Sequence, residues 1–125
     1  MKYKEILKEV KQRADLPDED AAAAATFATL DTLGERLAGN EPTNLADQLP
    51  AEFRDVLIRH AGEPQKYDLD EFFRRIAERQ RDGCTRAEAE THAHAVLATI
   101  GSFVSHGEMD DLRRQLPPEY EPIIG

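Results

Sequence analysis

One stretch of this sequence occurs twice, and the repeat limits what the chain can fold into more than any other feature. Residues 30–53 read LDTLGERLAGNEPTNLADQLPAEF, and residues 97–120 read LATIGSFVSHGEMDDLRRQLPPEY. Self-similarity over such a period indicates one structural unit that is used twice. The identical residues, at a constant spacing between the copies, are Leu30, Thr32, Gly34, Glu41, Leu45, Gln48, Leu49, Pro50 and Glu52, which recur as Leu97, Thr99, Gly101, Glu108, Leu112, Gln115, Leu116, Pro117 and Glu119.

The repeat predicts how the chain is organised. We expect repeat 1 over about residues 3–60 and repeat 2 over about residues 67–125, joined by a short linker at residues 61–66. A chain of 125 residues is large enough to bury one core of its own. Because both copies are amphipathic, we predict that they share this core in a single domain of residues 1–125.

Apolar residues recur at helical spacing along the chain, without the alternation that is typical of strands. The prediction is therefore an all-α fold with two pseudo-symmetric repeats, each made of a helix, a long helix, a short helix and a terminal helix or turn. The helices expected in repeat 1 cover residues 3–13, 18–37, 45–49 and 51–60. Those expected in repeat 2 begin at residue 68, cover residues 85–104 and reach residue 116, before a terminal turn.

Capping residues predict where these helices begin and end. Thr85 and Glu88 have the spacing of a capping box, and Gly39–Asn40 and His106–Gly107 are expected to end the two long helices. The residues expected to cap the other helices are Asp18, Asp68 and, for the first short helix, Thr43 or Asn44.

The acidic balance of the chain, a net charge of −9, argues against two classes of partner. It repels both the phosphate backbone of nucleic acids and the surface of anionic membranes. No apolar segment has the length of a membrane span, and the first residues do not read as a signal peptide. The single cysteine, Cys84, fits a reducing compartment. We therefore expect a soluble cytoplasmic protein that binds neither nucleic acid nor membrane.

A motif of the form QLP-x-E-aromatic closes each copy of the repeat. Its leucines are expected to be buried in the core, and its prolines to end the short helix and turn the chain. Its glutamines are expected to hydrogen-bond backbone groups that the end of that helix leaves unpaired. The alternative is a peptide-binding corner that is used twice. The motif residues are Gln48, Leu49 and Pro50 in repeat 1 and Gln115, Leu116 and Pro117 in repeat 2.

With this doubled motif after a long helix, the whole chain resembles the bacterial family known as domain of unknown function 2267. The resemblance implies two helical halves in tandem. It implies no activity, cofactor or catalytic residue, so none is transferred to positions of this sequence.

Three local patterns could carry chemistry, and each has a plainer explanation. His92 and His94 point about 200° apart on a helix, so they cannot hold one ion, and we expect neither metal nor cofactor. Cys84 precedes a helix and lies near Arg81 and Arg86, which would lower the pKa of its thiol, but no local motif places a histidine beside it, so we expect a passive cysteine. The basic stretch from Arg74 to Arg81 is interrupted by acids, so we expect a solvated helix face instead of an anion-binding site.

Small residues line a second face on both long helices, opposite the large apolar face. In a chain this rich in charge, an outer helix face should be charged, so small residues there indicate a second packing contact. The contact would join the two long helices within one chain, which we favour, or two copies in a homodimer. The residues that we expect in this contact are Ala24, Ala28 and Thr32 in repeat 1 and Ala95 and Thr99 in repeat 2.

These patterns favour a non-enzymatic module for protein interaction or assembly, monomeric and acting on an unidentified protein partner or on itself. No nucleophile motif, phosphate-binding loop or matched acid–base pair of carboxylates is evident in the sequence. The alternative is a small-ligand-binding protein or an enzyme with its site between the two helical halves. A concave pocket with converging polar groups would favour the alternative, and a broad apolar patch would favour the interaction module.

Overall fold

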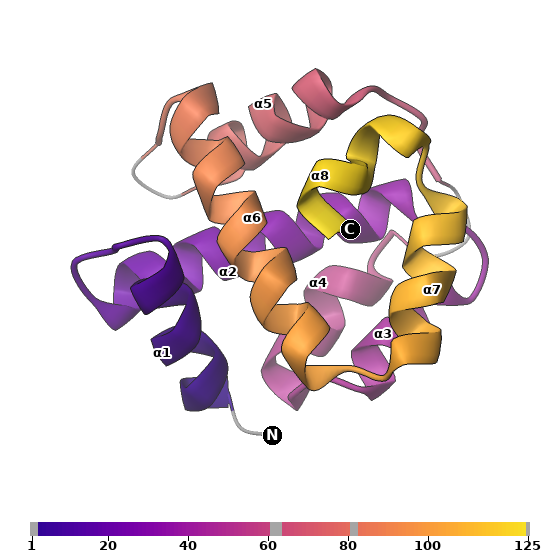
Figure 1. The fold of residues 1–125 in the computed structure, drawn as a ribbon, viewed down its shortest axis with the longest axis horizontal. Coiled ribbons are helices and arrows are strands. Elements are labelled where there is room, and N and C mark those ends of the chain that lie inside the picture. The colour runs from indigo at the N-terminus through magenta and orange to yellow at the C-terminus, as the bar shows by residue number, and fades with distance from the viewer. Residues whose placement is uncertain (1–2, 61–63, 81–82, 125) are drawn as a thin grey trace.

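The computed structural model describes residues 3–60, 64–80 and 83–124, and every regular element in these ranges is helical (Figure 1), which confirms the all-α prediction. The first half contains α1 (Tyr3–Arg13), α2 (Glu19–Arg36), α3 (Glu41–Asp47), the 3-10 turn η1 (Ala51–Phe53) and α4 (Arg54–Ile58). The second half contains α5 (Leu69–Arg79), α6 (Arg86–Phe103), α7 (His106–Gln115), the 3-10 turn η2 (Pro118–Tyr120) and α8 (Glu121–Ile124).

The order of the elements is the same in both halves. The long helices α2 and α6 each have 18 residues, and both of their ends fall at equivalent positions of the sequence repeat. The turns η1 and η2 also occupy equivalent positions. That the halves superpose about a two-fold axis stays a prediction.

The two long helices form the centre of the molecule. α6 crosses α2 and packs against it (Figure 1). The first helix of each half contacts both long helices, because α1 packs on α2 and α6, and α5 packs on α6 and α2. Each long helix is therefore covered on more than one side, which explains why its sequence carries more than one stripe of uncharged residues.

The core is one continuous cluster of buried side chains drawn from both halves. The flanking helices contribute one apolar face each, for example Ile6 and Val10 from α1 and Phe72 and Ile76 from α5, all of them fully buried. Phe27 of α2 lies half-buried at the edge of this core, where its ring packs on Phe53 at a centroid distance of 5.1 Å. The domain therefore depends on contacts between its halves.

The predicted caps of three helices are present. Asp18 Oδ1 accepts a hydrogen bond from Ala21 N at 2.8 Å, and Asp68 Oδ1 accepts one from Glu71 N at 2.9 Å. At the start of α6, Thr85 N donates to Glu88 Oε1 and Glu88 N donates to Thr85 Oγ1, which completes the capping box. Each bond satisfies a backbone N–H that the helix leaves free.

Several predicted boundaries around the short helices are wrong. α3 begins at Glu41 instead of residue 45, because Pro42 suits a first helical turn. His106–Gly107 begins α7 and does not end α6, because Ser105 Oγ accepts a hydrogen bond from Glu108 N at 3.1 Å and caps the new helix. The expected helix over residues 51–60 is the turn η1 followed by α4, which ends at Ile58. Gly39 has a φ of +60° but lies after α2 has ended at Arg36.

Gly34 of α2 lies where the backbone of α4 comes closest to the long helix. A Cβ atom at Gly34 would lie 2.6 Å from the Leu57 carbonyl oxygen, which is too short for any real contact. At the equivalent Gly101 of α6, a Cβ atom would meet only the Met109 side chain, at 3.5 Å. The same glycine of the repeat is thus a steric requirement in the first half alone.

The expected linker is described in part, because residues 61–63 lie outside the described ranges. Pro64, Gln65 and Lys66 have no regular secondary structure, and Gln65 N donates a hydrogen bond to the Glu35 carbonyl oxygen at 2.9 Å. This bond holds the connection between the halves against α2. In the described parts of the chain, no helix combines the length and the apolar character needed to cross a membrane.

Candidate functional site

The glutamines of the repeated motif join the two halves. Gln48 Oε1 accepts a hydrogen bond from Ser105 N at 2.7 Å, and Gln48 Nε2 donates to Ser105 Oγ at 3.2 Å. In the reverse direction, Gln115 Oε1 accepts from Ala38 N at 2.8 Å, and Gln115 Nε2 donates to the Ala38 carbonyl oxygen at 3.5 Å. Ala38 and Ser105 are equivalent positions of the repeat. Each glutamine therefore bonds the turn after the long helix of the other half.

The other motif residues occupy the places that the sequence indicates. Leu49 and Leu116 belong to the buried core, and Pro50 and Pro117 have the extended conformation that precedes the turns η1 and η2. Their position accounts for a corner in each half. The sequence did not indicate that the glutamines act across the halves instead of within their own corner, because hydrogen-bond partners far away in the chain leave no local pattern.

The small-residue stripe of repeat 1 borders a groove along α2. Ala28 and Thr32 are buried, whereas Ala24 is partly exposed and lines the groove. The groove has a volume of about 970 Å³ and extends from the α1–α2 turn to α4 and α5. It is lined by Pro17, Asp18, Asp20, Ala21, Ala23, Ala24, Phe27, Ala28, Asp31, Val56, Arg59 and Arg79. We call it the α2 groove.

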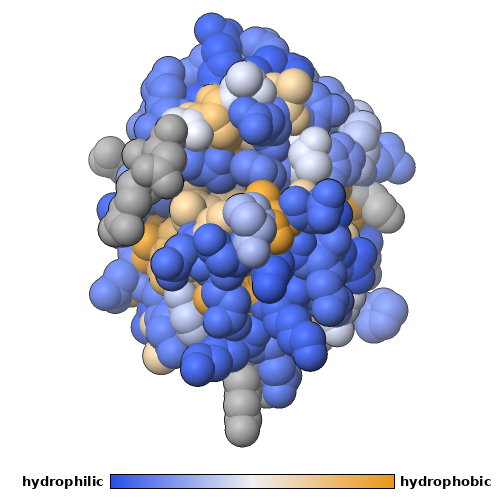
Figure 2. Space-filling view, turned by 90° about the vertical axis from the view of Figure 1, so that its left-hand side faces the viewer, coloured by the Kyte–Doolittle hydropathy of each residue, from blue (hydrophilic) through white to orange (hydrophobic). Residues whose placement is uncertain are grey.

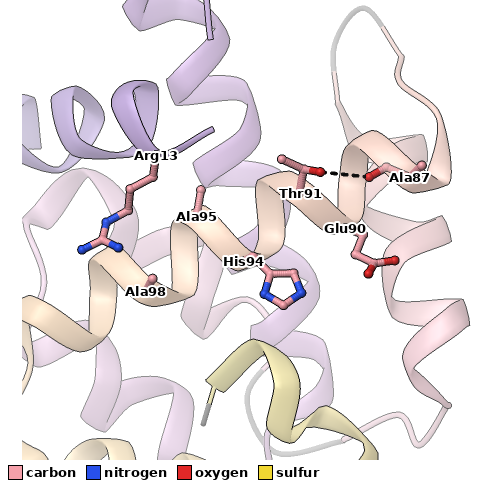
Figure 3. A pocket seen from close by; sticks show the side chains of 7 residues that line it. All are labelled: Arg13, Ala87, Glu90, Thr91, His94, Ala95 and Ala98. Atoms are coloured by element: carbon pink, nitrogen blue, oxygen red, sulfur yellow. Dashed lines mark hydrogen bonds between the residues drawn. The ribbon is translucent and has the colours of Figure 1, made fainter. Parts of the chain in front are cut away.

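A second groove follows α6 and has a volume of about 630 Å³. Figure 3 shows Arg13 of α1 projecting beside Ala95 and Ala98, with His94 on α6 nearby. Ala95 is buried at the floor, and Thr99, the last residue of the expected stripe, is buried one turn further on. The lining residues of this α6 groove are Arg13, Ala87, Glu90, Thr91, His94, Ala95 and Ala98.

The two grooves occupy equivalent places in the two halves. All the residues that α6 contributes to its groove are repeat equivalents of residues that α2 contributes to its own, with Ala24 and Ala28 matching Thr91 and Ala95. Each groove also receives an arginine from the first helix of the other half, Arg79 from α5 and Arg13 from α1. On the face that carries α1, most of the surface is hydrophilic and apolar residues gather in a band across its middle (Figure 2).

A buried carboxylate fixes the basic helix α5 against α2. Glu35, only 4% exposed, accepts hydrogen bonds from Arg75 Nη1 and Arg79 Nη2, each at 2.7 Å, and from the Tyr67 hydroxyl at 2.9 Å. Burial alone would raise the pKa of Glu35, but the bonds from Arg79, Arg75 and Tyr67 lower it to about 2. Burial and the Glu35 carboxylate raise the pKa of Tyr67 well above its usual range. This network holds the halves together at a second place.

The expected role of the Arg74–Arg81 stretch is thus partly wrong. Arg74 is exposed and pairs with Asp70 and Glu71 of its own helix, as a solvated face would. Arg75 and Arg79 instead point toward α2, where Arg79 Nη1 also donates to Thr32 Oγ1 at 2.9 Å. The charges along α5 alone do not indicate that the partner of Arg75 and Arg79 is Glu35 on α2. Arg81 lies outside the described residues.

The remaining candidates from the sequence lie apart. His92 is half-buried, and its Nδ1 hydrogen-bonds the side chain of Gln80 at 2.9 Å. His94 lines the α6 groove. The expectation that a helix start lowers the pKa of Cys84 is wrong, because burial and the nearby Glu88 raise it. Arg86 does not help the thiol, since its guanidinium pairs with Asp70 and Glu90.

Three carboxylates converge where α3 of the first half contacts α7 of the second. One oxygen from each of Glu41, Glu108 and Asp111 lies within 4.8 Å of the others. Glu41 and Glu108 are only 6% and 5% exposed. Burial, with Glu41 and Asp111 close by, raises the pKa of Glu108 above its usual range.

The sequence shows no matched pair of carboxylates at a local spacing, so this cluster was not predicted. A signal was present, because Glu41 and Glu108 are identical positions of the repeat. If a two-fold axis relates the halves, as predicted, two equivalent residues meet in space only where they lie close to that axis. The repeat alone does not say which of its positions do so, and the contact between α3 and α7 is a result of the packing.

The fold is that of an all-α domain in which Gln48 and Gln115 each bond from one half of the chain to the other. The chain belongs to the family described as an uncharacterized conserved protein (DUF2267), whose model matches residues 3–123. This match confirms the family resemblance. No curated protein matches the chain.

Proposed function

We propose that this chain is a non-enzymatic interaction module that holds two helical segments of a partner protein, one in each groove. The observation that carries the proposal is the equivalence of the α2 groove and the α6 groove, which gives one molecule two similar receptor surfaces. The network around Glu35 and the bonds of Gln48 and Gln115 support it, because they hold the two grooves at a fixed spacing.

The lining of the grooves favours helices with an apolar face as occupants. Small side chains such as Ala24 and Ala95 let the axis of a docked helix approach closely, since the distance between packed helices depends on the side chains at the contact. Arginines stand at the edge of each groove, with Arg59 about half exposed at one and Arg13 at the other. These arginines already have acidic partners, Asp31 for Arg59 and Glu9 for Arg13, so we expect the apolar face of each docked segment to supply the main contact.

Blocking one groove at a time tests this proposal. Ala24→Arg would fill the α2 groove, Thr91→Arg would fill the equivalent place in the α6 groove, and Ala51→Arg adds the same charge at an exposed position that lines neither groove. Each protein is used to capture partners from a native lysate, followed by mass spectrometry and by titration of the captured protein.

A partner that binds the parent chain and Ala51→Arg, and binds both groove variants at least tenfold more weakly, supports the proposal. A partner bound equally by all four proteins contradicts it. Sedimentation of the purified chain tests whether a second copy is the occupant, in which case the parent chain forms dimers that Ala24→Arg and Thr91→Arg do not form.

A further inference from the structure

We propose that Glu41, Glu108 and Asp111 form a binding site for one divalent cation at the joint between the two halves. Their carboxylate oxygens come from α3 and α7, and they lie within 4.8 Å of one another. Side-chain rotations that draw these oxygens together would let one ion contact all three, since oxygen ligands lie about 2.0–2.6 Å from Mg²⁺ or Ca²⁺. This inference goes beyond the proposed function, because the cluster shares no residue with either groove.

The two glutamates are built into the interior without any charge partner. Glu41 Oε1 and Glu108 Oε1 are buried from solvent, and neither has a hydrogen-bond partner in the described part of the protein. No ion pair to either glutamate occurs within residues 3–60, 64–80 and 83–124, whereas the buried Glu35 has two arginines. A buried and unpaired carboxylate is costly, and either a bound cation or a bound proton would offset that cost.

The third carboxylate distinguishes a cation from a shared proton. One proton between Glu41 and Glu108 would bridge two oxygens and would not involve Asp111, whereas one ion could bind all three carboxylates. Asp111 has one oxygen paired with Arg114 and is partly exposed, so it stands where an ion would enter from solvent. Three converging oxygens are the arrangement that a cation uses.

The chemistry of the ligands defines the class of cation. All three donors are carboxylate oxygens, and neither a histidine nor a cysteine belongs to the cluster. Hard ions such as Mg²⁺, Mn²⁺ and Ca²⁺ prefer such donors, whereas thiolate and imidazole ligands suit Zn²⁺ and Cu²⁺. Because α3 and α7 belong to different halves, an ion bound here would hold the halves together beside the bonds of Gln48 and Gln115.

The test uses the full chain after treatment with a chelator. Mg²⁺, Mn²⁺ and Ca²⁺ are titrated separately by calorimetry, and the melting temperature is measured with and without each ion. We expect one equivalent of at least one of these ions to bind and to raise the melting temperature. Asp111→Asn should weaken that binding at least tenfold, and Glu41→Gln and Glu108→Gln should abolish it.

Asp110→Asn is the matched control, because Asp110 is an exposed neighbour on α7 that pairs with Arg113 and should leave the affinity unchanged. Should a glutamine variant fail to fold, Asp111→Asn still decides the question. The proposal is overturned if no ion binds or stabilises the parent chain, or if Asp110→Asn weakens binding as much as Asp111→Asn. An absence of ion binding together with a Glu108→Gln variant more stable than the parent would show a shared proton instead. The outcome of this ion-binding test does not affect the function proposed for the α2 groove and the α6 groove, because the cluster shares no residue with them.

Discussion

At the scale of single residues, the two halves use the same amino acid for different purposes. Gly34 and Gly101 are equivalent in sequence, yet only Gly34 faces a backbone carbonyl oxygen at a distance that no side chain allows. Conversely, Glu41 and Glu108 are equivalent and end up beside each other. Identity across a repeat therefore says that a position matters and does not say why.

The two glycines give a prediction with its own control. Gly34→Ala should lower the free energy of unfolding by about 1–3 kcal/mol, because the new Cβ atom would lie against the Leu57 carbonyl oxygen. Gly101→Ala should be neutral or stabilising by up to about 1 kcal/mol, because alanine favours the helix and the flexible Met109 can move aside. Urea unfolding of both variants measures the difference. Equal effects would show that α4 does not pack on α2 as closely as described.

The depressed pKa of Glu35 predicts how stability depends on pH. Glu35 has an ordinary pKa of 4.5 and a folded-state pKa of about 2, so it stabilises the fold fully above pH 4.5 and loses this contribution as the pH falls toward 2. Comparing the free energy of unfolding of the parent chain with that of Glu35→Gln between pH 7 and pH 2 isolates the effect. The difference between the two proteins should shrink across that range.

The control for this measurement is Glu78→Gln, which changes an exposed carboxylate on α5. It should change stability little at any pH. A difference between the parent chain and Glu35→Gln that stays constant from pH 7 to pH 2 would contradict the assigned role of Arg75 and Arg79.

At the scale of elements, the sequence predicts the long helices and their caps better than the boundaries of the short helices. The caps at Asp18, Asp68 and Thr85 follow from side chains within three residues of the helix start, and all three are present. The boundaries near His106–Gly107 and Glu41 were wrong because a turn residue next to a cap can end one helix or begin another. The long-range partners of Gln48 and Arg79 had no local signal at all.

The corner formed by the QLP motif in each half provides a prediction at this scale. Leu49→Ala and Leu116→Ala should each lower the free energy of unfolding by about 2–5 kcal/mol, because both leucines are buried in the shared core. Denaturant unfolding of both variants, with the exposed Lys8→Ala as a control, measures the effect. Midpoints that stay unchanged would show that the corners are open to solvent and available for binding.

At the scale of the whole molecule, all-α architecture, a shared core and the order of helices followed from the sequence. Periodicity and repeated turns contain that information, because they report which face of each segment must be buried. The grooves and the carboxylate cluster did not follow, since they arise where α3 meets α7 and where the first helix of one half reaches the long helix of the other. The grooves and the cluster depend on how segments far apart in the sequence pack together, and no local sequence pattern indicates this packing.

The position of α1 and α5 has a consequence for a chain of half the length. Each of these helices covers the long helix of its own half and that of the other half, so a half-length chain on its own would leave part of its long helix bare. A second identical chain could supply the missing helix by exchange, and the glutamine of each chain would then bond the turn after the long helix of the other chain. We therefore predict that a half-length chain would be stable only as a dimer that exchanges this helix.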